Sequence, residues 1–194
     1  MALTEPIRNS NDVKKLVGYY LEKEEPRNYA LIVLGIYTAL RISDILNLRW
    51  RDVYDFNTEK FYECITLVEK KTGKDKCLAL NSDALQVLKY YQKKANNSWD
   101  KEGFLFVSKT DGRAISRIQA YRIVKKAAAA IGLPNNISCH SLRKTFGYHA
   151  WKKHVPVAVI MDIYNHTSLS VTRRYLGVCQ DDRNDVYKSM SFFD

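Results

Sequence analysis

The sequence predicts an α+β fold that is mostly α-helical and contains one small three-stranded antiparallel sheet. Apolar residues recur at helical spacing through most of the chain, whereas residues 51–80 are rich in β-branched and aromatic side chains. The chain has 194 residues, 46% of them hydrophobic, which suffices for one substantial core. No repeat or Gly/Ser/Pro-rich linker interrupts it, so we expect a single domain over residues 1–194 that begins with a flexible lead at residues 1–10.

Three helices are predicted in the first fifty residues. The first follows a polar start near residue 10, where apolar residues begin to recur at helical spacing. The second runs from Pro26 to about Leu40 and is expected to be largely buried, because this stretch is mostly apolar. Ser43 can cap a short third helix.

The β-rich stretch is broken by two polar turns, at residues 57–58 and 72–74. Three segments joined by two turns predict the three-stranded sheet. The second turn is surrounded by cations, namely Lys70, Lys71, Lys74 and Lys76.

Helical spacing returns beyond the sheet. One helix is expected after residues 81–82, and a later one is ended by Gly132 and Pro134. The expected ranges of the last four helices are 116–131, 140–154, 156–163 and 170–177.

The charge and the cysteines narrow the class of protein. A formal net charge of +10 favours a polyanionic partner, because neutralising phosphates releases counterions, but charge alone does not separate DNA from RNA or anionic lipid. The four cysteines are far apart and form no CxxC pair, so we expect reduced thiols in a cytoplasmic protein and no zinc site. The first eleven residues lack the apolar segment of a secretory signal, and the longest apolar run is too short to span a membrane.

Arg41 closes the apolar run of residues 30–40 and therefore needs an anion at the edge of the core. One interpretation is structural, with Asp44 as the partner of an ion pair. The other is functional, because Arg41 and Arg143 together can clamp two oxygens of one phosphate and stabilise charge at a pentacoordinate phosphorus.

His140 and Arg143 lie one turn apart on a predicted helix, near its N-terminus, which is a favourable place for an anion. An HxxR pattern is common, and taken alone it indicates a capping histidine and a surface arginine. His166, in a predicted turn between two helices, is by itself typical of a loop residue or a cap.

Tyr175 is one of thirteen tyrosines, so a packing role is the ordinary interpretation. It lies on a short predicted helix beside Arg173 and Arg174, nine residues after His166. A free phenol has a pKa of roughly 10, so attack on phosphorus near neutral pH requires a proton acceptor or nearby cations. His140, the arginines and Lys71 can provide them.

Lysines at a hairpin turn also have two interpretations. Usually they are solvated charges that protect a sheet edge. On a turn that reaches into a DNA groove, however, a lysine can protonate the departing 5′-oxygen, which leaves poorly as an alkoxide.

Taken together and in order, these segments resemble the tyrosine recombinases, also called phage integrases. Residues 38–48 are similar to the family's first arginine box, TGLRxSExxxL, with Ala39 in place of glycine and Asp44 in place of glutamate. Residues 140–146 are similar to the second box, HxLRHTF.

The third box, LGHxxxxTTxxY, is similar to residues 164–175, with Asn165 in place of glycine. The family's turn lysine maps best onto Lys71, with Lys70 and Lys74 as competitors. The resemblance covers about residues 10–178, and none of the substitutions removes a reactive group.

The resemblance implies a transesterification of double-stranded DNA that needs no metal, ATP or other cofactor. Tyr175 attacks the scissile phosphate to give a 3′-phosphotyrosyl bond and a free 5′-hydroxyl, and strand exchange reverses the step. In the implied roles, Arg41, Arg143 and His166 stabilise the transition state, His140 assists proton transfer, and Lys71 is the general acid.

Such enzymes act as homotetramers on two DNA sites, and we expect a monomer without DNA. Typical members also have an N-terminal core-binding domain, whereas only about ten residues precede the first helix here, so the chain is expected to be a catalytic fragment or a small member without that domain. The tail, residues 178–194, needs apolar cover from its own core or from a neighbouring protomer. Its apolar side chains are Val186, Tyr187, Met190, Phe192 and Phe193.

Further phosphate contacts rest on charge and location alone, and a solvated face is the better interpretation of each of them taken singly. These candidates are Lys70, Lys74, Arg113, Arg117, Arg122 and Lys144. Two other functions stay open: a type IB topoisomerase-like relaxing enzyme with the same active site, and a non-catalytic DNA-binding module, against which the presence of every reactive residue type argues.

Overall fold

The computed structural model describes residues 4–71, 73–95 and 100–192. Its helices are α1 (Ser10–Glu22), α2 (Pro26–Tyr37), α3 (Ile42–Ile45), α4 (Ser82–Lys94), α5 (Arg117–Ala130), α6 (Cys139–Lys152), α7 (Val157–Ile163), α8 (Leu169–Leu176) and α9 (Gln180–Ser189), with a 3-10 turn, η1 (Trp50–Asp52). Its strands are β1 (Tyr54–Asp55), β2 (Lys60–Phe61), β3 (Cys64–Val68) and β4 (Asp75–Ala79). The mostly helical α+β class is confirmed.

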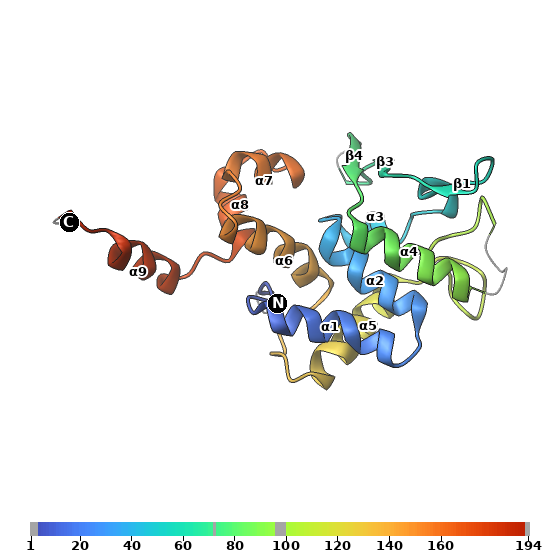
Figure 1. Cartoon of the computed structure of the whole chain (residues 1–194), viewed down its shortest axis with the longest axis horizontal. Coiled ribbons are helices and arrows are strands. Elements are labelled where there is room, and N and C mark those ends of the chain that lie inside the picture. Colours follow the sequence, from blue (N-terminus) through green and yellow to red (C-terminus); the bar gives the residue numbers. More distant parts are fainter. Residues whose placement is uncertain (1–3, 72, 96–99, 193–194) are drawn as a thin grey trace.

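The helices form two neighbouring groups (Figure 1). Helices α1, α2, α4 and α5 lie together beside the strands, α6 to α8 form the second group, and α9 extends away from both. Helix α2 contacts α1, α4 and α6, so it is the central element that joins the two groups. Its buried character is confirmed, because residues such as Leu31, Ile32 and Leu34 have no exposed surface.

Local signals set the helix ends. Asn9 caps α1 by accepting from the backbone N–H of Asn11 over 2.8 Å. Pro26 occupies the first turn of α2, where its missing N–H has no intrahelical partner to lose. A capping box starts α5, since the Ser116 hydroxyl accepts from the Gln119 N–H and the Gln119 side chain accepts from the Ser116 N–H.

The expected three-stranded sheet is instead two two-stranded antiparallel sheets. Strand β1 pairs with β2, and β3 pairs with β4 from Cys64 opposite Ala79 to Val68 opposite Asp75. The predicted middle strand is interrupted at residues 62–63. Strand β1 is only two residues long, because the Asp55 carboxylate accepts from the Asn57 N–H and the Thr58 hydroxyl and closes the turn to β2 early.

A small apolar cluster supports the part of the molecule where the candidate residues gather. It is formed by the buried residues Ala39, Ile160, Tyr164 and Leu176, which come from the link after α2 and from α7, its end and α8. Two larger clusters fill the rest, one around α2, α4 and the hairpins and one among α1, α2, α5 and α6.

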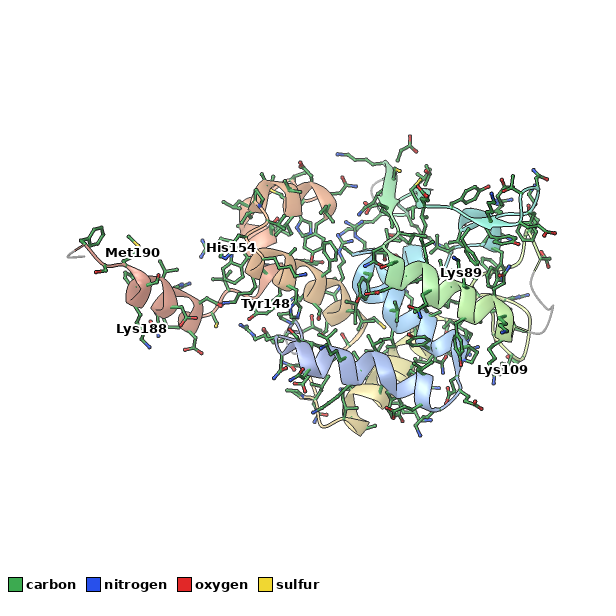
Figure 2. All side chains as sticks on the ribbon, viewed as in Figure 1. Lys89, Lys109, Tyr148, His154, Lys188 and Met190 are labelled. Atoms are coloured by element: carbon green, nitrogen blue, oxygen red, sulfur yellow. The ribbon has the colours of Figure 1, made fainter. Side chains whose placement is uncertain are left out.

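The tail forms α9, a helix that the sequence pattern did not predict. Asp182 ties its first turn to the body through Lys152, 2.7 Å away. Beyond this point the apolar side chains of Val186, Tyr187, Met190 and Phe192 are 57–80% exposed. Figure 2 shows Lys188 on α9 and Met190 just after it, both away from the body of the molecule. Phe193 lies outside the described residues. No helix in the described ranges is long and apolar enough to cross a membrane.

Candidate active site

The fold brings His140, Arg143 and His166 together around the ring of Tyr175. The centre of the Tyr175 ring, on α8, lies 5.0 Å from the His140 ring on the first turn of α6 and 4.6 Å from the His166 ring in the link between α7 and α8. The Arg143 guanidinium carbon lies 5.9 Å from the same ring. Tyr175 is therefore surrounded by proton-handling and cationic groups, the setting that a nucleophilic phenol requires.

Arg143 is almost wholly buried, with 1% of its surface exposed, and backbone carbonyls fix its guanidinium. Nη1 donates to the carbonyl of Ala39, and Nη2 donates to the carbonyl of Tyr164 over 2.8 Å. The Tyr164 hydroxyl in turn donates to the carbonyl of Arg143 over 2.7 Å. Gly147 permits this contact, because a Cβ there would lie 2.2 Å from the Tyr164 hydroxyl.

Two left-handed residues present these carbonyls. Ala39 and Asn165 both have φ near +52°, a conformation that non-glycine residues rarely adopt. They are the positions at which the resembling family has glycine, so the departures in sequence keep the glycine-like backbone. Ala39 itself supplies one of the two carbonyls that accept from Arg143. Asn165 directly follows Tyr164, which supplies the other.

Arg41, just before α3, has a partner that the sequence interpretation did not include. Its Nη1 donates to Glu69 Oε2 over 2.8 Å, not to Asp44. Asp44 is buried and accepts from the backbone N–H of Lys70 over 3.1 Å. The sequence allowed an ion pair between Arg41 and the nearby Asp44. In the fold, the hairpin instead brings the carboxylate of Glu69, 28 residues away, to Arg41.

Glu69 is fully buried, and two further side chains approach it. Asn165 Nδ2 donates to its Oε2 over 3.0 Å, and Lys76 Nζ lies 3.6 Å from its Oε1. Lys76 also donates to the carbonyl of Ile163 over 2.5 Å, and burial together with Arg143 lowers its pKa. For Glu69 and Lys76 the only sequence signal was their position around the lysine-bearing turn of residues 69–76, whereas Asn165 was noted as a replacement of glycine in the third box.

His166 is held in a defined orientation. Its Nδ1 lies 3.1 Å from the Thr172 hydroxyl. The Thr172 hydroxyl also lies 3.4 Å from the Ser168 carbonyl, so its single proton goes either to that carbonyl or to Nδ1. Donation to Nδ1 leaves the ring proton on Nε2, which suits donation to a phosphate oxygen. Burial, with Arg143 and Arg41 nearby, lowers the pKa of His166 to about 4, so the ring is neutral near pH 7.

His140 has an exposed edge but packs against Tyr175 on its other side. Partial desolvation lowers its pKa, and Lys144, Arg143 and Arg41 add to the effect. A neutral imidazole beside a phenol can accept the phenol's proton.

Lys144, one of the predicted phosphate contacts, is buried in the structure. It is 4% exposed, because its Nζ donates to the carbonyl of Thr4 in the segment before α1, over 2.5 Å. The same ammonium lies 5.7 Å from the centre of the Tyr175 ring. Its helix face turns inward, so it contributes a positive potential near Tyr175 from within the fold.

The lysine turn borders an open cleft of about 500 Å³. Arg41, Lys70, Lys71 and Arg117 all line this cleft, which brings four of the predicted phosphate-binding residues to one surface. Lys74, Arg113 and Arg122 are exposed but do not line it. In the described ranges, no three His, Cys, Asp or Glu side chains are grouped so that they could hold a metal ion.

Comparisons with known proteins agree with this arrangement. Residues 9–181 match the model of the phage integrase family. A probable integrase/recombinase of Bacillus subtilis, YoeC, is 39% identical over 188 residues, which are 97% of both chains.

Two solved structures share the fold at lower identity. A XerA recombinase has a TM-score of 0.76 and 20% identity, covering 97% of this chain and 64% of that one. A XerH site-specific recombinase bound to its palindromic difH substrate after cleavage has a TM-score of 0.75 and 21% identity, covering 96% and 53%. The chain therefore spans little more than half to two thirds of these longer proteins but nearly all of the Bacillus relative, and it belongs to the phage integrase family, the tyrosine recombinases of site-specific DNA recombination.

Proposed function

We propose that this chain cleaves and rejoins double-stranded DNA through a covalent bond to Tyr175. The observation that carries the proposal is the grouping of His140, His166 and Arg143 around the Tyr175 ring, with centre distances of 5.0 and 4.6 Å to the two histidines. Such a site needs no metal, since guanidinium groups supply the charge that stabilises the transition state.

In the proposed reaction, the Tyr175 oxygen forms a bond to phosphorus and the bond to the 5′-oxygen breaks. His140 takes the phenol proton, and Lys71 gives a proton to the departing 5′-oxygen. Arg41, Arg143 and the Nε2 proton of His166 stabilise the charge on the non-bridging oxygens. The free 5′-hydroxyl of a partner strand then attacks the phosphotyrosine, so the bond energy is kept and no cofactor is required.

DNA is proposed to lie across the cleft lined by Arg41, Lys70, Lys71 and Arg117. Exposed cations close to a phosphate backbone raise affinity without reading sequence. We propose Lys74, Arg113 and Arg122 as outer contacts, whereas Lys144 is proposed to act from within the fold on Tyr175 and not on a DNA phosphate.

We further propose that residues 1–194 form one catalytic domain, which assembles as a homotetramer on two DNA sites. The support is the tail: Val186 and Tyr187 on α9 and Met190 and Phe192 just beyond it are exposed apolar side chains that need cover. A neighbouring protomer is the proposed source of that cover. We place the enzyme in the cytoplasm, where its DNA substrate and reduced thiols are expected.

A nicked suicide substrate tests the proposal. When the fragment with the 5′-hydroxyl diffuses away, religation is blocked and the covalent product accumulates on a denaturing gel. We expect an adduct with the wild type and none with Tyr175→Phe. An adduct that persists in Tyr175→Phe would sink the nucleophile assignment, and relaxation of any supercoiled plasmid without recombinant products would favour a topoisomerase.

A further inference from the structure

We propose that Glu69 is a positioning residue of this active site, which holds Arg41 in its phosphate-binding place and fixes the base of the lysine-bearing hairpin. The inference rests on the proposed function. Glu69 belongs to none of the motifs that relate the chain to its family, and its role follows from its contacts.

Glu69 connects segments that are far apart in the sequence. Its carboxylate accepts from Arg41 Nη1 over 2.8 Å and from Asn165 Nδ2 over 3.0 Å, and Lys76 Nζ lies 3.6 Å away. Arg41 comes from the link between α2 and α3, and Asn165 from the link between α7 and α8. One buried side chain thus sets the spacing between the first arginine and the loop that carries His166.

The charge of Glu69 balances a concentration of cations. Arg41, Arg143 and Lys76 repel one another: burial lowers the pKa of Lys76, Arg143 and Arg41 lower it further, and a carboxylate among them offsets that repulsion. When no DNA phosphate is bound, Glu69 supplies that negative charge. It occupies Nη1 of Arg41, and a guanidinium has five N–H donors, so donors remain for the phosphate.

The backbone of Glu69 also fixes the start of the lysine turn. Its N–H donates to the carbonyl of Lys74 over 2.9 Å, and its carbonyl accepts from Gly73 over 2.8 Å. The next N–H, that of Lys70, donates to the buried carboxylate of Asp44. Glu69 is therefore fixed by both its side chain and its backbone. Lys71, the proposed general acid, lies two residues after it.

A positioning role through Arg41 makes a specific kinetic prediction. Glu69→Gln should slow single-turnover cleavage of the suicide substrate by about 10- to 100-fold, the loss that a misplacement of about 1 Å can cause, while the affinity for DNA changes little. In an Arg41→Ala background the same substitution should have no further effect, because the group through which it acts is absent. Glu63→Gln is the matched control, since Glu63 is an exposed carboxylate at the other end of the same hairpin.

A second substrate gives a readout that altered stability would not change. A methylphosphonate at the scissile position is neutral and demands less charge stabilisation, so the defect of Glu69→Gln should shrink on it. Glu69→Asp keeps the charge but is one methylene shorter, and it should reproduce the slow cleavage if the glutamine variant fails to fold.

The outcomes separate the inference from the proposed function. If the wild type forms no adduct, the proposed function fails and the inference falls with it. If the wild type forms the adduct and Glu69→Gln and Glu69→Asp cleave at the wild-type rate, only the inference is overturned. An equal slowing by Glu69→Gln in the wild-type and Arg41→Ala backgrounds would also overturn it.

Discussion

Arg143 and Tyr164 hold each other in both directions: the Arg143 guanidinium donates to the Tyr164 carbonyl over 2.8 Å, and the Tyr164 hydroxyl donates to the Arg143 carbonyl over 2.7 Å. The guanidinium carbon also lies 4.6 Å from the centre of the Tyr164 ring. This reciprocal pair joins α6 to the end of α7, so Arg143 is part of the framework as well as of the reactive site.

Arg143→Lys should therefore destabilise the protein as well as inactivate it. A single ammonium cannot reach the carbonyls of Ala39 and Tyr164 with the geometry of the guanidinium fork. We expect a loss of about 2–4 kcal/mol in the free energy of unfolding, since hydrogen bonds from charged groups contribute about 1.5–3 kcal/mol each. Urea denaturation measures it. The exposed Arg173→Lys is the control, and an equal effect of the two would contradict the assignment.

The left-handed turn at Asn165 predicts an order of stability. Both Asn165→Gly and Asn165→Ala lose the bond to Glu69, but only glycine adopts φ of +52° without a Cβ penalty. The glycine variant should be more stable by about 1 kcal/mol. At Ala158, which is exposed within α7, replacement by glycine should instead cost about 1 kcal/mol. The reverse order at Asn165 would show that the turn is not left-handed in solution.

Stability should fall as the pH falls from 7 toward 4. His166 has a folded-state pKa of about 4, below its unfolded value of about 6.5, so between these values the unfolded chain binds a proton that the folded chain does not. The stability that the folded protein gains from keeping His166 neutral is present in full above pH 6.5 and is lost as the pH falls toward 4. The free energy of unfolding, measured at pH 7.5 and 5.5, should change less in His166→Gln than in the wild type. The exposed His154→Asn should keep the wild-type change.

Gly177 follows the last residue of α8, the helix that carries Tyr175. Both its backbone conformation and the space around it disfavour a larger residue. Its φ is +63°, and a Cβ would lie 2.9 Å from Pro6 of the segment before α1. Gly177→Ala should cost more than the left-handed penalty of about 1–2 kcal/mol, because Pro6 must also move. Gly132→Ala provides the comparison, since φ is +76° there and nothing lies within 4 Å of the added Cβ. Equal losses in thermal unfolding would argue against the contact with Pro6.

The exposed face of α9 predicts a variant that separates folding from assembly. Tyr187 is 78% exposed, so Tyr187→Asp should change the free energy of unfolding by less than about 0.5 kcal/mol. If α9 docks on a neighbouring protomer, the same change should weaken the complex of several protomers on DNA. Analytical ultracentrifugation with and without DNA makes the comparison. An unchanged assembly would indicate that the tail has no intermolecular role.

Local signals made most of the helices predictable. Capping groups and prolines are read from a few neighbouring residues, as at Asn9, Pro26 and Ser116, and their effect is largely independent of the rest of the fold. The strands were less predictable. A pattern of β-branched residues does not reveal that Asp55 closes a turn directly after β1, or that the expected middle strand breaks between Phe61 and Cys64.

The sequence alone determined the reactive residue types, their order and their spacing, because these are properties of the chain and were enough to indicate the family. Only the tertiary structure decided their partners. Arg41 pairs with Glu69 and not with Asp44, and Lys144 points inward to Thr4, because long-range contacts depend on how the hairpin, α6 and the first residues pack. The tertiary structure also showed why Ala39 and Asn165 can replace glycine: the backbone keeps its left-handed turns, and these turns hold Arg143 beside Tyr175.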